Sequence, residues 1–174
     1  GDECPFCYLE REVERRAIRY VLGSGASYME PEVRAATDSS GFCRGHYKKM
    51  YDDGKFGQAV YAESEYLHAG DITKINPDDY KKAHWRHSYN AIKYLTHNLG
   101  PLLYVMNDEV VSVACMEPDT VYNPHKLGKE NGVALFKTAK GAVIRILISF
   151  GSYCKNGHRF RIMGTKGTIE TGFD

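Results

Sequence analysis

Four residues near the start of the chain have the types and the spacing of a metal site. Cys4 and Cys7 form a C-x2-C pair, and Cys43 and His46 form a C-x2-H pair. Three thiolates and one imidazole are the ligand set of a closed tetrahedral zinc site, so the pattern predicts zinc here. The alternative is a set of buried thiols and a core histidine. A redox C-x2-C is disfavoured because no strand precedes it.

Farther along the chain, His97 has the chemistry of an acid/base group. Histidine titrates near neutral pH, so it can exchange a proton with a sugar hydroxyl. Such an exchange is required when hydride leaves a carbinol carbon, because the hydroxyl proton must also leave. Tyr94 lies three residues earlier, on a similar face if the segment is helical. The alternatives are a hydrogen-bonded core histidine for His97 and a packing role for Tyr94.

Further side chains could contact the same substrate as His97. Trp85 offers an apolar platform for a sugar ring, and Arg86 can donate hydrogen bonds to hydroxyls or a carboxylate. Glu63, Glu65 and His68 lie on one predicted strand and could also face a substrate. A surface stack or hinge contact is the alternative for Trp85 and Arg86, and a solvated strand face is the alternative for the two glutamates.

The elements that position these residues change in character near residue 54. Residues 1–53 have helical spacing of apolar positions and are predicted to form a small helical Cys/His module. Residues 54–174 are rich in strands and successive hairpins, which predicts an antiparallel meander. We therefore expect an α+β fold: an open, mainly antiparallel sheet with helices on one face and no Rossmann domain. The expected strands are 58–68, 110–116, 132–137, 142–150, 158–163 and 168–171, with a helical stretch at 89–106 interrupted at Gly100-Pro101.

Composition excludes several classes of protein. The formal net charge is +1, which gives no electrostatic case for nucleic acid or an anionic membrane. The longest apolar runs are too short to span a bilayer. The acidic first residues lack the apolar stretch of a signal peptide, so we expect a cytoplasmic protein. Five cysteines, an odd number, then favour thiols or metal ligands over disulfides.

Two parts of the chain resemble known families. Residues 3–53, with CPFCYLEREVERRAIRYVLGSGASYMEPEVR and GFCRGHYKKMYD, resemble the start of an uncharacterised bacterial family with a CPFC…FCxxH pattern. Residues from about 50 to 174 contain GKFGQAVYAESEYLH, HWRHSYNAIKYLTHNLGPLLYVMND, EVVSVACM and RIMGTKGTIET. They resemble the C-terminal α/β domain of the glucose–fructose oxidoreductase, inositol dehydrogenase and MocA-type family.

The second resemblance implies a substrate-side domain. In that family a Rossmann domain binds NAD(P), and the C-terminal domain covers the nicotinamide and contacts the substrate. Many members place an Asp-x3-His pair on the helix matching residues 93–97, where the histidine acts in acid/base chemistry. Here His97 is present but Lys93 stands at the aspartate position, which puts the proton relay in doubt. Residues 94–101 look more like the branch of NAD-dependent glycosidases.

The sequence lacks the glycine pattern of a dinucleotide site. The nearest match, Gly23-Ser24-Gly25, follows a helical segment and has neither the third glycine nor a βαβ context. The family's Glu-Lys-Pro motif is also absent. We therefore expect a truncated C-terminal domain that neither binds NAD tightly nor turns over alone.

Three functional hypotheses follow. The first is the substrate-binding and catalytic domain of an NAD(P)-dependent sugar or polyol oxidoreductase. The second is a zinc-stapled binding or scaffold protein without catalysis. The third is a glycosidase-type domain that uses the same cleft and NAD. The expected partners are a sugar-like small molecule and a second copy that could associate through the sheet face or edge.

Overall fold

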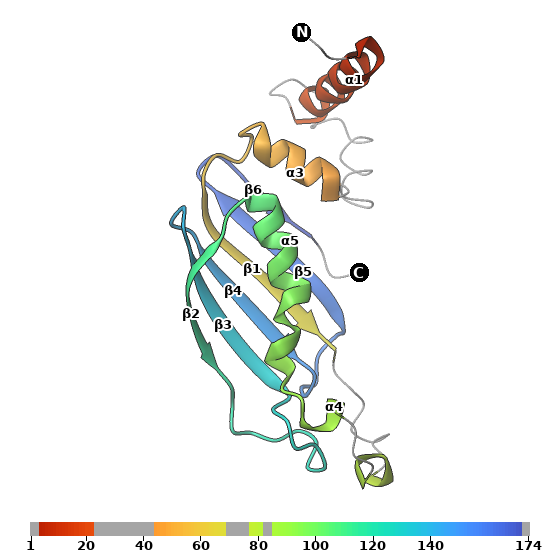
Figure 1. Ribbon diagram of the computed structural model, residues 1–174, viewed down its shortest axis with the longest axis vertical. Coiled ribbons are helices and arrows are strands. Elements are labelled where there is room, and N and C mark those ends of the chain that lie inside the picture. The colour runs from red at the N-terminus through yellow and green to blue at the C-terminus, as the bar shows by residue number, and fades with distance from the viewer. Residues whose placement is uncertain (1–3, 23–43, 69–76, 82–84, 172–174) are drawn as a thin grey trace. The chain divides into compact units, whose positions relative to one another are not determined.

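The computed structural model describes residues 4–22, 44–68, 77–81 and 85–171 (Figure 1). The chain divides into two compact units, residues 1–50 and residues 51–174. Cys43 and the Gly23-Ser24-Gly25 segment lie outside the described residues. None of the helices in the described ranges is long and apolar enough to cross a membrane.

The first unit contains two described helices, α1 (Pro5–Leu22) and the greater part of α3 (Arg44–Asp52). Both lie where the helical spacing predicted them. A polar contact joins the two helices, because Lys49 of α3 donates to the carboxylate of Glu14 on α1. His46 Nε2 lies 3.5 Å from the same carboxylate.

The second unit is built on a six-stranded open sheet, which confirms the predicted α+β class. The spatial order is β2-β3-β4-β1-β5-β6, and every neighbouring pair is antiparallel except β1 with β4. The strands are β1 (Ala59–Leu67), β2 (Val110–Met116), β3 (Asn131–Thr138), β4 (Val143–Ser149), β5 (Gly157–Gly164) and β6 (Thr168–Glu170).

The expected meander is wrong at one point. β4 and β5 do not pair with each other, because β1 lies between them. β1 is parallel to β4, with Tyr66 opposite Ile148, and antiparallel to β5, with Tyr66 opposite His158. A strand that arrives from far away in the sequence gives no local turn signal, so hairpin patterns could not reveal this insertion.

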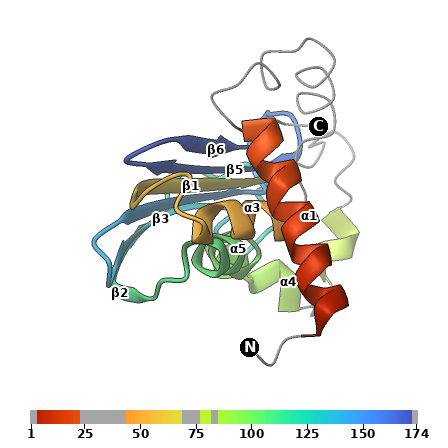
Figure 2. The same cartoon turned by 90° about the horizontal axis from the view of Figure 1, so that it is seen from above.

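Two helices of this unit cover one face of the sheet, as expected (Figure 2): α5 (Thr96–Met106) and the 3-10 helix η3 (Ala91–Leu95) that precedes it. Two shorter helices come earlier in the chain, α4 (Trp85–Ser88) and η2 (Pro77–Lys81). The predicted interruption at Gly100-Pro101 is wrong, since α5 continues through Pro101. Packing of the following turns against the sheet offsets the hydrogen bond that proline removes. The change of helix type falls between Leu95 and Thr96 instead.

The core lies between α5 and the sheet. Ile144, Ile146 and Ile148 alternate along β4 and are fully buried, while Leu102 and Met106 meet them from α5. Burying each of these side chains contributes about 1.5–3 kcal/mol, so this layer fixes the helix on the sheet. The residues between them in the strands lie on the opposite, open face, whose exposed apolar members include Val133, Leu135, Val143 and Met163.

Candidate functional site

The strand topology brings several aromatic and basic residues to one end of the sheet. β1 and β4 are parallel, so their last residues lie side by side, and the amide of His68 donates to the carbonyl of Ser149 at 2.8 Å. β5 is antiparallel to β1, so it begins at this same end, where His158 is its second residue. Phe150, directly after β4, is added to the group.

Tyr66 lies at the centre of this group. Its ring stacks on that of its cross-strand partner His158, with the ring centroids 4.1 Å apart. The Phe150 ring meets Tyr66 edge-on at 5.4 Å, and the His68 ring stacks at 6.0 Å. Tyr66 therefore forms an aromatic floor with imidazoles around it.

The helical layer supplies the other side of the site. The Tyr94 ring of η3 lies 6.5 Å from Tyr66 and 5.1 Å from Phe150. The His97 ring, in the first turn of α5, lies 5.9 Å from Tyr66 and 5.7 Å from Tyr94. His97 is exposed to solvent, which places its imidazole beside the site rather than in the core.

An open cavity of about 350 Å³ lies over this floor. Its size falls at the lower end of the range for small-molecule sites, and its walls combine aromatic rings with a few polar groups. His97 borders two of its lining residues without lining it. The lining residues are Tyr66, His68, Tyr89, Tyr94, Lys126 and Phe150.

Burial and neighbouring charges change the titration of two basic groups here. Burial lowers the pKa of the Lys126 ammonium, and the charge of Glu130 partly opposes this effect. Burial also lowers the pKa of His158, and repulsion from His97 and then His68 lowers it further. The protonated forms of Lys126 and His158 are therefore less favoured here than in water.

A buried hydrogen-bonded chain holds the first turn of α5 on the sheet. Asn98, directly after His97, donates from Nδ2 to the hydroxyl of Ser64 on β1. The Ser64 hydroxyl donates to the carbonyl of Arg159 on β5 at 2.8 Å. Both side chains are fully buried, so they fix the position from which His97 projects.

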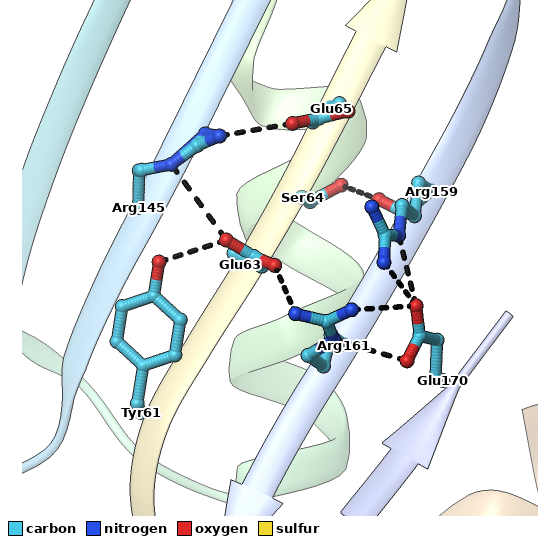
Figure 3. A network of polar contacts seen from close by, with 8 residues as sticks. All are labelled: Tyr61, Glu63, Ser64, Glu65, Arg145, Arg159, Arg161 and Glu170. Atoms are coloured by element: carbon cyan, nitrogen blue, oxygen red, sulfur yellow. Dashed lines mark hydrogen bonds and ion pairs between the residues drawn. The ribbon is translucent and has the colours of Figure 1, made fainter.

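Two predicted substrate contacts lie on the other face of the sheet. Glu63 and Glu65 alternate with Ser64 and Tyr66 along β1, so they point away from α5 (Figure 3). Glu63 accepts from Arg161 at 2.9 Å, and Glu65 accepts from Arg145 at 2.9 Å. The structure therefore does not bring these carboxylates together with His97.

The same network continues to the edge of the sheet, where Glu170 of β6 binds Arg159 and Arg161 (Figure 3). Hydrogen bonds from Arg161 and then Arg159 lower the pKa of Glu170 to about 2. On the inner strand, burial and the neighbouring Glu63 raise the pKa of Tyr61. The network is thus a row of ion pairs that joins neighbouring strands on the open face of the sheet.

Two of the remaining predicted residues, Trp85 and Lys93, lie beside the lining residue Tyr89. Trp85 is 54% exposed, and its ring meets the lining residue Tyr89 edge-on at 5.2 Å. Lys93 is exposed, with Nζ 5.2 Å from the centroid of the Tyr89 ring. The side chain of Arg86 lies outside the described part of the structure.

Among the described residues, no group of three or more His, Cys, Asp or Glu side chains could hold a metal ion. Cys4 and Cys7 are exposed at the start of α1, and His46 lies beside Glu14. Backbone N–H groups of Cys7 and then Phe6 lower the pKa of the Cys4 thiol, which favours the thiolate. Because Cys43 lies outside the described residues, zinc binding stays a prediction.

The described residues do not fit a dinucleotide. Within the described ranges, no strand leads through a glycine-rich turn into a helix, the arrangement that binds a pyrophosphate. The described glycines with positive φ lie elsewhere: Gly54 and Gly57 follow α3, Gly141 lies between β3 and β4, and Gly157 begins β5.

Sequence reasoning missed four lining residues: Tyr66, Tyr89, Lys126 and Phe150. Tyr66 and His68 are two residues apart and share a strand face, which is a signal that could have found Tyr66. Phe150 continues the buried face of β4. Lys126 lies in the connection between β2 and β3, where no pattern singled it out.

Solved structures with a similar fold include oxidoreductases and dehydrogenases. An oxidoreductase domain protein from Kribbella flavida is 20% identical, with a TM-score of 0.58 over 74% of this chain and 36% of that chain. The scyllo-inositol dehydrogenase from Lactobacillus casei, with bound NAD(H) and scyllo-inositol, is 16% identical, with a TM-score of 0.61 over 74% and 38%. The WlbA dehydrogenase from Bordetella pertussis, in complex with NADH and UDP-GlcNAcA, is 21% identical, with a TM-score of 0.58 over 72% and 38%.

A curated protein is also similar to this chain over part of its length. Glycosyl hydrolase family 109 protein 3 from Phocaeicola vulgatus is 29% identical over 146 residues, which cover 68% of this chain and 26% of that protein. The chain thus spans about a quarter of this relative and less than two fifths of the three solved structures. The predicted resemblance to the C-terminal domain of the inositol dehydrogenase class is confirmed.

The second unit therefore has the fold of a domain found in these solved oxidoreductase and dehydrogenase structures. The sequence of residues 1–98 matches a protein family that is described as "Family of unknown function (DUF6062)". The match covers more than half of the chain, and the chain belongs to this family. It runs past the predicted boundary at residue 53 and includes Cys4, Cys43 and His97.

Proposed function

We propose that residues 51–174 are the substrate-side domain of an NAD(P)-dependent sugar or polyol oxidoreductase. The observation that carries this proposal is the aromatic cavity at the end of β1, with exposed His97 beside it. The fold shared with dehydrogenases that bind inositol supports it. A domain with only a packing role has no need of an open cavity bordered by three imidazoles.

The cavity offers complementary groups for a polyol ring. The apolar faces of a sugar ring pack on Tyr66 and Phe150, while the hydroxyls of Tyr89 and Tyr94 exchange hydrogen bonds with the sugar hydroxyls. His97, held by the Asn98–Ser64 hydrogen bond, is the proposed proton acceptor for a hydroxyl at the mouth of the cavity.

The nucleotide is expected to be held by a separate nucleotide-binding domain. The role of residues 51–174 is then limited to binding the sugar and exchanging its hydroxyl proton, and the chain alone is expected to be inactive. Lys93, which replaces the carboxylate of the family pattern, is exposed near Tyr89 and is proposed to assist His97 from the rim.

Sugar binding can be measured directly on the whole chain. Trp85 is the single tryptophan and contacts the lining residue Tyr89, so its fluorescence should change when myo-inositol or D-glucose binds. Tyr94→Ala should weaken binding about tenfold because it removes one aromatic wall. The matched control is Tyr153→Ala, since Tyr153 is fully exposed and does not line the cavity. Absence of saturable binding, or equal losses in both variants, would refute the proposal.

A glycosidase-type function is the second candidate, favoured by the match to glycosyl hydrolase family 109 protein 3. It would use the same cavity, with His97 again next to the reacting carbons. The product distinguishes the two. With NAD supplied and a nucleotide-binding domain present, release of 4-nitrophenol from an aryl glycoside supports the glycosidase. Net accumulation of NADH with a free sugar supports the oxidoreductase.

For residues 1–50 we propose a structural zinc site at Cys4, Cys7, Cys43 and His46. The lowered pKa of Cys4 at the start of α1 supports it, because zinc binds the thiolate. One equivalent of zinc per chain is expected by metal analysis, with loss in Cys43→Ala. A wild-type protein that is folded and free of metal would contradict this site.

Self-association through the open sheet face is proposed from its exposed apolar side chains, among them Leu135 and Val133. Leu135→Lys should then lower the sedimentation coefficient at a given concentration. A wild-type chain that stays monomeric at all concentrations would rule this out.

A further inference from the structure

We infer that the ligand of the cavity at the end of β1 carries an anionic group, a carboxylate or a phosphate, in addition to sugar hydroxyls. The inference rests on the proposed sugar site and names its substrate class. It comes from the charges around the cavity, which are all of one sign among the described lining residues.

The titratable groups that line or border the cavity come from four parts of the fold. Lys126 and His68 line it, while His97 and His158 border it through their contacts with Tyr66. Among the described residues that line the cavity, none is acidic. The described chargeable groups other than tyrosines that line or border this space are therefore basic, and the nearest described acidic group is Glu130, which acts on Lys126 without lining the cavity.

Lys126 is the strongest single observation. Its ammonium lies over the Phe150 ring, 5.6 Å from the centroid, and the side chain is about half removed from water. Within the described part of the chain, Lys126 forms no ion pair. The pKa of Lys126 is lowered because burial disfavours the charged form, and an adjacent anion would reverse that effect. A neutral hydroxyl would not.

The Glu130 carboxylate, whose charge acts on Lys126, also accepts hydrogen bonds from the backbone. Glu130 is buried, and one of its oxygens accepts hydrogen bonds from the amides of Tyr122 and Asn123 at 3.0 and 2.8 Å. These bonds hold the connection between β2 and β3 in place. Glu130 thus holds the loop that carries Lys126, and it does not line the cavity as Lys126 does.

The loop around Lys126 is anchored beside the cavity. The amides of Leu127 and Gly128 both donate to the carbonyl of His87, at 2.9 and 3.0 Å. Gly128 packs so closely that an added Cβ would lie 2.6 Å from the carbonyl oxygen of Tyr89. Lys126 is therefore placed by a constrained backbone and is not a solvated surface lysine.

The three imidazoles add a second, independent observation. His158 stacks on Tyr66, and its pKa is lowered partly by repulsion from His97 and His68. A bound anion would favour the protonated form of an imidazole beside it, and that form can donate a hydrogen bond to the anion. A cluster of this kind favours a ligand with negative charge over a neutral polyol.

The experiment compares four probes on the whole chain by Trp85 fluorescence and calorimetry: D-glucose, D-glucuronate, D-glucose 6-phosphate and inorganic phosphate. At least one of the two anionic sugars should bind about tenfold more tightly than D-glucose, since hydrogen bonds to charged groups are the stronger ones. Tighter binding of the glucuronate assigns a carboxylate, and tighter binding of the 6-phosphate assigns a phosphate.

Substitutions then test whether Lys126 causes the preference for an anionic sugar over D-glucose. Lys126→Gln should abolish this preference. Lys126→Arg should retain it, which would also show that the loop still folds. The matched control is Lys137→Gln, which removes the same charge from an exposed position on β3 and should change nothing.

The outcomes separate this inference from the proposed function. If D-glucose binds as tightly as both anionic sugars and Lys126→Gln has no effect, the anionic class is wrong and the sugar site stands. If phosphate binds through Lys126 but no sugar binds, the anion site stands and the sugar function fails. Absence of binding for all four probes overturns both.

Discussion

Removing the hydroxyl of Ser64 tests how α5, and with it His97, is fixed on the sheet. In the folded protein the Ser64 hydroxyl accepts from Asn98 and donates to the carbonyl of Arg159 at 2.8 Å. Ser64 and Asn98 are both fully buried, so water cannot replace either partner. Ser64→Ala therefore leaves the Asn98 amide group buried without this acceptor.

The size of the effect follows from these contacts. A neutral hydrogen bond contributes about 1 kcal/mol net, and a buried polar group without a partner costs about 1–3 kcal/mol. We expect Ser64→Ala to lower the free energy of unfolding by about 2–3 kcal/mol. Asn98→Ala should cost about 1–3 kcal/mol, because Ser64 keeps its bond to Arg159. Since both substitutions remove one shared bond, the double variant should lose at least about 1 kcal/mol less than the sum.

Urea unfolding followed by far-UV circular dichroism measures all three variants. Ser112→Ala is the matched control, because Ser112 is exposed on the edge strand β2 and should change stability by less than about 0.5 kcal/mol. Strictly additive losses, or a Ser64→Ala variant as stable as the control, would refute the role assigned to this hydrogen bond.

Three further predictions concern charge and space. Two arginines lower the pKa of Glu170 to about 2, so its contribution to stability is complete above pH 4.5 and is lost as the pH falls towards 2. In that pH range, Glu170→Gln should reduce the pH dependence of the free energy of unfolding measured in urea. His97→Gln should raise the pKa of His158, measured by NMR titration, because it removes a repelling charge. Gly128→Ala should destabilise the fold by about 1–3 kcal/mol in urea unfolding, because its Cβ meets the Tyr89 carbonyl oxygen at 2.6 Å.

Each of these has a result that would contradict it. The Glu170 effect should shrink in high salt, since the side chain is partly exposed, and an unchanged slope in Glu170→Gln would exclude it. An unmoved titration of His158 would show that His97 exerts no repulsion. For Gly128 the control is Gly100→Ala in α5, where an added Cβ meets nothing within 4 Å and should be tolerated.

The strands were predictable because their pattern is local. Ile144, Ile146 and Ile148 repeat with period two, and the structure buries all three against the helical layer. The predicted strand at residues 110–116 coincides with β2. The insertion of β1 between β4 and β5 was not predictable, because it depends on pairing between residues far apart in the chain.

The site was predictable only in part. His68 and Tyr94 line the cavity and His97 borders it, in keeping with residue types chosen for sugar chemistry. Glu63 is also a polar group on β1, but its side chain points to the opposite face of the sheet from Tyr66 and His68. Which face of a strand meets the helices is known only once the sheet is formed. Lys126 could not be found, since a lysine in a long connection looks the same whether it is solvated or held over an aromatic ring.

The single parallel contact of the sheet has a consequence for how the protein assembles as it is synthesised. The β3–β4 and β5–β6 pairs are joined by short turns and can form as soon as they leave the ribosome. β1 is made much earlier, yet it has no partner strand until β4 has been made, and it gains its second partner only with β5. Pulse-labelled hydrogen exchange during refolding should therefore show protected amides in β3 and β4 before those of β1.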